Sequence, residues 1–353
     1  MKTKLYLIVI VLIVSVFMFS GYVLSADQKP KTVAELALYK GADRQQILEG
    51  GARKEGKLTM YTTGILKQTV RPKVKAFQKK YPYIKVEIWR ASTSKLLPRV
   101  LEEYKTSRQF VDVIELSQAA QLVLEETGIL QPFYSPELAH IEEGALRRAS
   151  GGGVSSAGHY SNARVLGYNT KLINREELPK THQDLLDPKW KEKVALARGM
   201  GALGWMGAIL DAYGEDLVRR LAKQNFDVHM VSARALLDMI IGGEYVCSPG
   251  MAEAHVKKSR QEGAPIDYVV LEPAFVILGQ IVLPKHSAHP HAAMLYINFD
   301  LTKEVGELYS ATGYVSPRKD VSGEETYKKY YGPFSTKQYA QWEELFSGLF
   351  LKK

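Results

Sequence analysis

The chain has 353 residues, with 47 Lys and Arg against 38 Asp and Glu, which gives a formal net charge of +9. This basic excess is modest and dispersed, and no DNA-binding or RNA-binding motif accompanies it, so we expect no nucleic-acid partner. Cys247 is the only cysteine, which excludes an internal disulfide, and no HExxH, CxxC, EF-hand, GxSxG or P-loop pattern indicates a metal site or an enzyme.

Residues 1–26 are typical of a secretory signal peptide. Lys2 and Lys4 precede an uncharged run over residues 5–24, and small residues near position 25 suit a signal peptidase. We expect cleavage and export to the periplasm. Because a run of about 20 uncharged residues is long enough to span a bilayer, an uncleaved membrane anchor is the alternative.

Three short apolar runs, each followed by a helical pattern, open the predicted core. The strands are expected at residues 58–61, 84–89 and 111–116, and the helices at 68–80, 92–104 and 118–126. This alternation predicts right-handed βαβ units. The Gly-, Ser- and Thr-rich loops after the strands should meet at the carboxyl edge of the sheet, where open α/β sheets bind ligands. Lys73, Lys75, Lys79 and Lys80 are predicted to lie on solvated helix faces.

The glycines at 151–153 interrupt this alternation of strands and helices, and we place the first crossing of the chain between two lobes there. A strand is expected at 164–170, a turn or short helix at 185–190, a strand at 194–196, and helices at 202–213, 216–223 and 233–241. Residues 245–247 are predicted to form a strand that ends at Ser248-Pro249-Gly250 and is followed by a helix at 252–262.

Residues 266–271 and 275–282 are predicted to be paired strands that return the chain to the first lobe. Helices are expected at 289–299 and 303–311, so His286, His289 and His291 suit a turn into a helix better than a metal site. An aromatic, charged segment follows residue 318.

Several segments together resemble extracellular solute-binding proteins of the iron-binding subgroup, which are receptors of ABC importers. The segments are LTMYTTG, KAFQKKYP, IKVEIWRAS, VDVIELS, GILQPF, VLGYNTKLI, DLLDPKWKEKVALA and ATGYVSPR, within residues 57–318. The resemblance implies an α/β, two-lobed type 2 periplasmic binding fold, in which each lobe is a mostly parallel sheet flanked by helices and two hinge strands join the lobes.

The implied boundaries place lobe 1 at residues 27–158 and 276–318, lobe 2 at 159–275, and a C-terminal helical segment at 319–353. The implied partners are a small-molecule solute and the membrane subunits of an ABC permease. The receptor is expected to be a monomer.

The metal ligands of ferric-binding members do not carry over to this chain. Those members have a Tyr-Tyr pair after the strand that corresponds to residues 245–247, where this chain has Cys247-Ser248-Pro249. The histidine of their first loop is absent from residues 62–65, and the expected acid after the third strand falls near Ser117. Because hydroxyls and amides are poor ligands for a hard ferric ion, we expect no metal and no cofactor.

The strand-end loops offer hydrogen-bond donors at helix starts, where free N–H groups and the helix dipole favour an anion. Arg198 follows a buried strand and can hold a carboxylate through two parallel hydrogen bonds. Glu272 could pair with Arg198, bind a ligand amine or make a hinge hydrogen bond, while Tyr160 could form an aromatic wall. The predicted ligand-binding residues are Thr62, Thr63, Gly64, Ser92, Thr93, Ser94, Ser117, Tyr160, Arg198, Gly199, Ser248 and Glu272.

Each of these residues also has a structural interpretation, since Ser and Thr are preferred helix caps in any protein. The favoured hypothesis is a periplasmic receptor that captures a small, anionic organic solute in an interlobe cleft and delivers it to a permease. The alternatives are a receptor for ferric iron or an iron complex, and a sensor partner of a signalling protein. The sequence contains no recognisable nucleophile–base pair, so we do not expect an enzyme.

Overall fold

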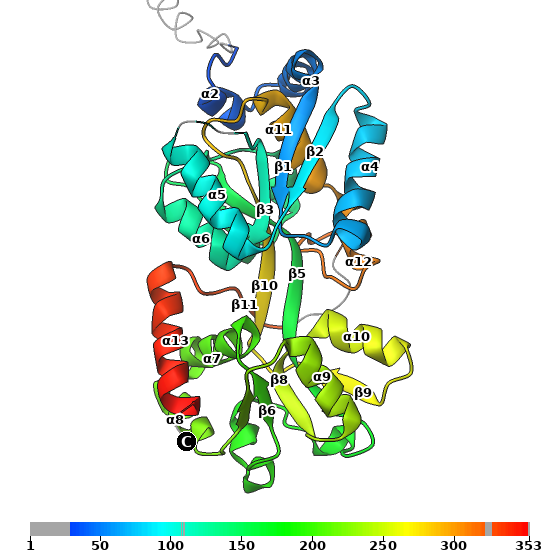
Figure 1. Ribbon diagram of the computed structural model, residues 1–353, viewed down its shortest axis with the longest axis vertical. Helices are drawn as coiled ribbons and strands as arrows, with labels where there is room; N and C mark the ends of the chain where they lie inside the picture. Colours follow the sequence, from blue (N-terminus) through cyan, green and yellow to red (C-terminus); the bar gives the residue numbers. More distant parts are fainter. Residues whose placement is uncertain (1–28, 107, 109, 322–326, 352–353) are drawn as a thin grey trace, which may run out of the picture.

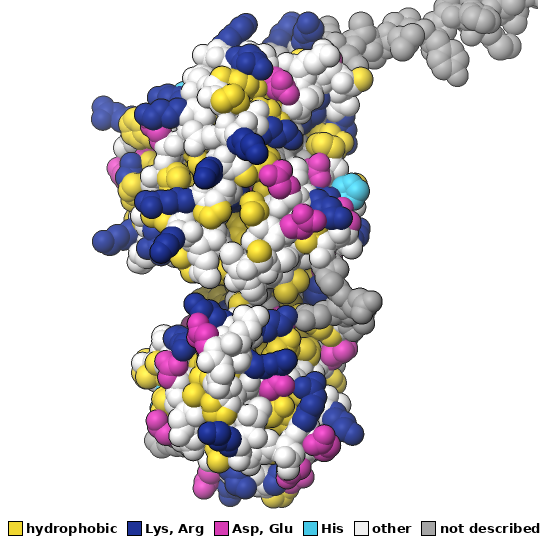
Figure 2. Space-filling view, turned by 90° about the vertical axis from the view of Figure 1, so that its right-hand side faces the viewer, with side chains coloured by type: hydrophobic (Ala, Val, Ile, Leu, Met, Phe, Trp, Pro, Cys, Tyr) yellow, Lys and Arg dark blue, Asp and Glu magenta, His cyan; other side chains and the backbone are white. Residues whose placement is uncertain are grey.

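The computed structural model describes residues 29–106, 108, 110–321 and 327–351, so the predicted signal peptide at 1–26 lies outside the described residues. Two lobes lie one above the other, joined by the long strands β5 (Val154–Asn169) and β10 (Ala274–Val282) (Figure 1). The space-filling view shows a narrow waist between them (Figure 2). The predicted two-lobed α/β architecture is confirmed. Within the described part of the chain, no helix is long and apolar enough to cross a membrane.

The upper lobe is built on a sheet with the strand order β2-β1-β3-β10-β5-β4. Strands β1 (Lys57–Thr62), β2 (Lys85–Arg90) and β3 (Val113–Ser117) are parallel, whereas β10 is antiparallel to both β3 and β5. Its other elements are β4 (Leu146–Arg148), η1 (Leu66–Val70), α2 (Val33–Leu38), α3 (Arg44–Glu55), α4 (Arg71–Lys80), α5 (Thr93–Lys105), α6 (Gln118–Glu126), η2 (Pro136–His140), η3 (Glu143–Ala145), α11 (Pro290–Asp300) and α12 (Lys303–Ser310).

Helices cover both faces of this sheet, which explains why the inner strands β1 and β3 are buried on both sides. Met60 belongs to a core with Phe77 of α4 and Tyr296 of α11. Its neighbour Tyr61 points to the opposite face and joins a core with residues of α5 and α6, among them Leu96 and Leu124.

The lower lobe uses the second half of β5, which pairs antiparallel with β8 (Cys247–Ala252) and β9 (Ile266–Val269). Strands β6 (Ala195–Ala197) and β7 (Asp227–His229) are parallel, so the pairing in this lobe is mixed. Its other elements are η4 (Arg175–Glu177), η5 (Gln183–Leu186), η6 (Pro188–Trp190), α7 (Met200–Tyr213), α8 (Glu215–Ala222), α9 (Ala233–Gly242), α10 (Glu253–Gln261), β11 (Lys329–Tyr330) and α13 (Thr336–Phe350). The C-terminal helix α13 packs on this lobe through Trp342, Phe346 and Phe350.

Three predicted features of the strands were wrong. The strand predicted at residues 164–170 starts earlier, because β5 runs unbroken from Val154. Polar residues in its first half have hydrogen-bond partners, and Ser161, for example, donates to the Val315 carbonyl. Strand β8 begins rather than ends at Cys247, since Pro249-Gly250 lies opposite a shift in register and Gly250 has φ of 79°. Strands β9 and β10 each pair with β5 and not with each other.

Candidate functional site

The three strand-end loops of the upper lobe meet, and they lie on the edge that faces the lower lobe (Figure 1). Thr62 at the end of β1 is aligned with Arg90 of β2 and Glu115 of β3. The Thr63 N–H donates to the Glu115 carbonyl at 3.0 Å, and the Ala91 N–H donates to the Thr62 carbonyl at 3.1 Å. Backbone hydrogen bonds therefore hold the three loops together.

The side chains at this edge differ in what they can offer to a ligand. Thr62 is fully buried, and its hydroxyl donates to Glu115 Oε2 at 3.1 Å and accepts from the Gly64 N–H at 2.9 Å. The Thr62 hydroxyl therefore holds the loop in place and has no hydrogen left to donate to a ligand. The remaining predicted donors of the edge are partly or fully exposed: Thr63, Ser92, Thr93, Ser94 and Ser117.

A buried charge cluster lies beneath this edge. The Lys73 ammonium of α4 is 2.5 Å from Glu115 Oε1 and 2.5 Å from Asp300 Oδ1, and the side chains of all three residues are at most 4% exposed. His159 Nδ1 lies 2.7 Å from Asp300 Oδ2, and Tyr296 donates to Glu115 at 3.0 Å. The prediction that Lys73 lies on a solvated face was wrong, because its position one turn before Phe77 places it on the buried side of α4.

Opposite charges keep these groups ionised despite their burial. Burial acts to lower the pKa of Lys73, but Asp300 and Glu115 outweigh it and raise that pKa well above its ordinary value. Burial acts to raise the pKa of Asp300, but its interactions with His159 and Lys73 lower it. The cluster is therefore an internal salt-bridge network that joins α4, β3, β5 and α11.

This cluster contains the one group of described residues whose spacing suits a metal ion, namely Glu115, His159 and Asp300. Their candidate ligand atoms lie within 4.8 Å of one another. Because the Lys73 ammonium contacts both carboxylates at 2.5 Å, it already occupies the position between them that a metal ion would need. The three residues therefore do not fit a metal while Lys73 keeps this position.

Tyr160 lies where the two connecting strands face each other. It is paired with Gly279 of β10, and a Cβ on Gly279 would come within 2.1 Å of the Tyr160 ring. Tyr160 also contacts the rings of Tyr309 and Tyr314, with centroids 5.0 and 4.7 Å away. Its ring forms part of an aromatic cluster beside the waist of the molecule, and burial raises the pKa of its hydroxyl.

The lower lobe contains a cavity of about 210 Å³ at the carboxyl ends of its strands. It brings together three of the predicted site residues, Arg198, Gly199 and Ser248. Gly201 at the start of α7 approaches Gly250 of β8 so closely that a Cβ on Gly201 would lie 2.4 Å from the Gly250 carbonyl oxygen. The cavity is lined by Arg164, Ala197, Arg198, Gly199, Met200, Gly201, Ala202, Val231, Ser232, Ala233, Leu236, Ser248, Pro249, Gly250 and Met251, with no acidic residue among them.

Arg164 of β5 is the cavity residue that the sequence analysis missed. Its Nε is buried without a hydrogen-bond partner, and no ion pair joins its guanidinium to another residue of the described chain. Burial lowers its pKa to about 10. In the sequence, Arg164 is the one charged residue in the apolar pattern at residues 163–166. That pattern predicted a strand, but the arginine was not recognised as a site residue.

Arg198 and Glu272 do not form the pair that the sequence suggested. The Arg198 guanidinium lies 3.9 Å from Glu343 of α13, and both side chains are about one third exposed. Glu272 is exposed between β9 and β10, where its backbone carbonyl accepts a hydrogen bond from the Tyr213 hydroxyl. Ser248 is buried, and its hydroxyl donates to the Pro249 carbonyl at 3.1 Å.

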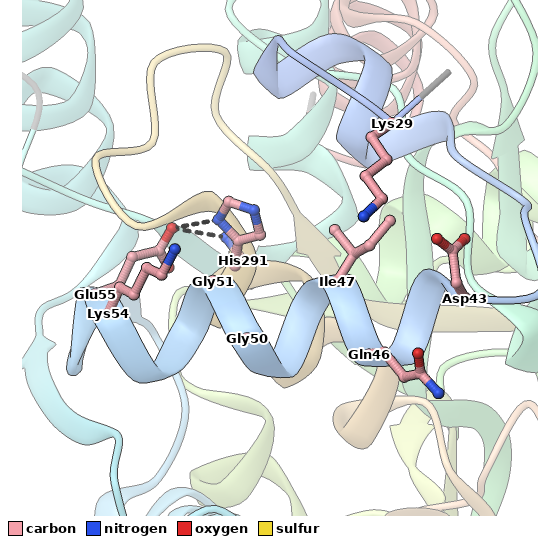
Figure 3. A pocket seen from close by; sticks show the side chains of 9 residues that line it. All are labelled: Lys29, Asp43, Gln46, Ile47, Gly50, Gly51, Lys54, Glu55 and His291. Carbon is pink, nitrogen blue, oxygen red and sulfur yellow. Dashed lines mark hydrogen bonds and ion pairs between the residues drawn. The ribbon is translucent and has the colours of Figure 1, made fainter. Parts of the chain in front are cut away.

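A wider pocket of about 490 Å³ lies on α3 at the far end of the upper lobe (Figure 3). His291 points into it and is held by Glu55, which accepts bonds from His291 Nδ1 at 2.6 Å and from the Ala292 N–H at 2.8 Å. Glu55 thus caps the start of α11. The pocket is shallow and lies away from the waist, so we do not assign the solute to it.

The three histidines near residue 290 have separate partners, and the helix predicted at 289–299 is α11, which starts at Pro290. His289 Nδ1 lies 2.9 Å from Asp112, His291 bonds Glu55, and His286 stacks on Tyr104. They do not converge on one point. The residues that follow strand β8 are Glu253 and Ala254, so no tyrosine pair stands there.

Comparison with known sequences gives a family for most of the chain. The model of a family described as bacterial extracellular solute-binding protein matches residues 73–332. An uncharacterised protein of Haemophilus influenzae is 26% identical over 274 residues, which cover 74% of this chain and 77% of that protein.

Solved structures of similar fold bind different solutes. The Trichodesmium protein IdiA (FutA), in complex with iron and citrate, superposes with a TM-score of 0.71 at 17% identity, over 84% of this chain and all of that chain. AfuA from Actinobacillus pleuropneumoniae, with fructose-6-phosphate bound, has a TM-score of 0.61 at 19% identity, over 85% of this chain and all of that chain. At these identities the likeness establishes the fold alone.

Proposed function

This chain belongs to the bacterial extracellular solute-binding protein family, and we propose that it is the periplasmic receptor of an ABC importer for a small, anionic organic solute. The solute binds between the two lobes and is delivered to the membrane subunits of a permease. The protein performs no covalent chemistry on it.

The observation that carries this proposal is the charge of the lower-lobe cavity. Arg164 and Arg198 line it, and none of its lining residues is acidic. The first turn of the 14-residue helix α7 opens into it, which adds free N–H groups and the positive end of a helix dipole. A carboxylate or phosphoryl group bound there gains charge-assisted hydrogen bonds from both sources.

The upper lobe supplies the opposite wall of the proposed site. Its accessible donors at the strand ends are Thr63, Gly64, Ser92, Thr93, Ser94 and Ser117, and Tyr160 and Tyr314 provide aromatic surface beside the waist. Thr62 acts through its hydrogen bond to the Gly64 N–H, which shapes the loop. Glu272 has no role in this arrangement, because the cavity that contains Arg198 does not include it.

Closure of the lobes connects binding to transport. A solute that contacts both walls binds the closed form more tightly than the open form, so it shifts the population toward closure. The permease then recognises the closed form. Iron bound as a complex with an organic anion, as in the FutA structure, is the second candidate, because an anionic partner could use the same arginines.

A ligand screen by thermal unfolding tests the proposal. We expect citrate, other carboxylates or fructose-6-phosphate to stabilise the protein, by about 2.7 kcal/mol at 100 times the dissociation constant, and spermidine to have no effect. Arg198→Gln should weaken the response, whereas Arg220→Gln on the exposed face of α8 is the matched control. Stabilisation by spermidine alone, or by ferric ion without an organic anion, contradicts the proposed solute class.

A further inference from the structure

The half-buried side chain of Arg164 differs from the buried cations of the described chain in having neither an acidic nor a carbonyl partner. Lys73 has two carboxylates within 2.5 Å, and the guanidinium of Arg318 bonds both Glu137 and Asp320. Arg44 donates to the Tyr134 carbonyl at 2.8 Å and lies over the Tyr134 ring. The side chain of Arg164 has no hydrogen bond or ion pair to any residue that the structure describes, and its Nε is buried.

Among the described residues, no acidic group interacts with the Arg164 guanidinium. The ionisable groups that interact with it are the phenols of Tyr160 and Tyr314 and the imidazole of His255. Burial lowers the pKa of His255, and the positive charges of Arg164, Arg234 and Lys258 lower it further. Although burial lowers the pKa of Arg164 to about 10, the guanidinium stays charged at neutral pH. An ionised group buried without a partner destabilises a protein.

The position of Arg164 relates this charge to the ligand cavity. It lies on β5, one of the two strands that join the lobes, and is paired with Ala252 of β8. Its side chain lines the 210 Å³ cavity, where Cδ is 3.8 Å from the place of a Cβ on Gly201. The side chain of Arg164 therefore lies beside the first turn of α7.

We propose that Arg164 is the residue that selects the solute, because its missing counter-ion is the carboxylate or phosphoryl group of the solute itself. This inference rests on the proposed function as an anion receptor and assigns the main charge recognition to Arg164. Arg198 has a smaller role, since its guanidinium is more exposed and Glu343 lies near it. Binding neutralises a charge that is unfavourable in the empty receptor, which adds to the affinity for an anion over a neutral solute.

This assignment predicts opposite effects of one substitution on binding and on stability. Arg164→Met keeps the apolar part of the side chain and removes the charge. The ligand-free variant should unfold at the same or a higher urea concentration than the wild type, because an unpaired buried charge has been removed. The same variant should bind anions at least about 30-fold more weakly, as expected when one partner of a buried charge pair is lost.

The experiment measures urea midpoints without ligand and dissociation constants by calorimetry for citrate, fructose-6-phosphate and inorganic phosphate. It compares the wild type with Arg164→Met, Arg164→Lys, Arg198→Met and the surface control Arg220→Met. The proposal requires the largest loss of affinity in Arg164→Met, a partial loss in Arg164→Lys, and no loss of stability in Arg164→Met. A wild-type affinity in Arg164→Met overturns this inference alone, as does a lowered urea midpoint, which makes Arg164 a structural residue. A wild type that binds none of the three anions overturns both this inference and the proposed anion class.

Discussion

Removal of the Lys73 ammonium should destabilise the upper lobe severely. Lys73→Met leaves Glu115 and Asp300 buried, with carboxylate side chains that are 4% and 0% exposed and have lost their shared cation. Removing one partner of a buried ion pair typically lowers the free energy of unfolding by about 3–5 kcal/mol. Since total stabilities are about 5–15 kcal/mol, this loss is a large share of the whole. Urea unfolding followed by circular dichroism measures it.

Two further variants show whether the effect comes from charge. Lys75→Met removes an exposed lysine from the same helix and should change the free energy of unfolding by no more than about 0.5 kcal/mol. The triple variant Lys73→Met, Glu115→Gln, Asp300→Asn carries no unpaired charge from the three residues and should be more stable than Lys73→Met. If the free energy of unfolding of Lys73→Met lies within about 1 kcal/mol of the wild-type value, the salt-bridge network does not stabilise the upper lobe and the reasoning is wrong.

Two more predictions concern the upper lobe. In α3, Gly50→Ala should stabilise the protein by about 0.4–1 kcal/mol, because its new Cβ meets no atom within 4 Å. In contrast, Gly51→Ala places a Cβ 2.2 Å from the His291 ring and should destabilise it by about 1–3 kcal/mol (Figure 3). Thermal unfolding of the two neighbours compares them directly, and a stabilised Gly51→Ala contradicts the packing. The pKa of Asp300 is lowered to about 2, so its contribution to stability is complete above about pH 4 and is lost as the pH falls toward 2. Between about pH 4 and pH 2, the free energy of unfolding should therefore depend less steeply on pH in Asp300→Asn than in the wild type. An unchanged pH dependence contradicts the lowered pKa of Asp300.

The sequence predicted the upper lobe well because its elements follow simple patterns. Strands β1 and β3 are short apolar runs covered on both faces, β2 is the edge strand beside them, and each of the three precedes a helix with apolar residues at helical spacing. The lower lobe was harder. Its strands pair with β5 from distant parts of the chain, and the Pro249-Gly250 turn signal lies inside β8 at an irregular register.

The candidate site could be predicted only in part. Arg198 and Gly199 follow β6, so the rule that ligands bind at strand ends was sufficient to group them, and Ser248 lies in the neighbouring strand β8. Lys73 and Arg164 needed tertiary information, because their importance depends on which charges surround them. A lysine among basic neighbours on a helix looks solvated, and an arginine in a strand carries no local sign that its counter-ion is missing.

The buried Lys73 and the half-buried Arg164 together support the proposed anion over a metal as the solute. In the upper lobe, the acids Glu115 and Asp300 that could have received a metal ion are both paired with Lys73. In the lower-lobe cavity, Arg164 is not neutralised, and no lining residue is acidic. A receptor for a free metal ion needs unpaired acceptors, whereas a receptor for an anion needs unpaired donors. The donors that line the described cavity therefore support the proposal of an anionic solute over a free metal ion.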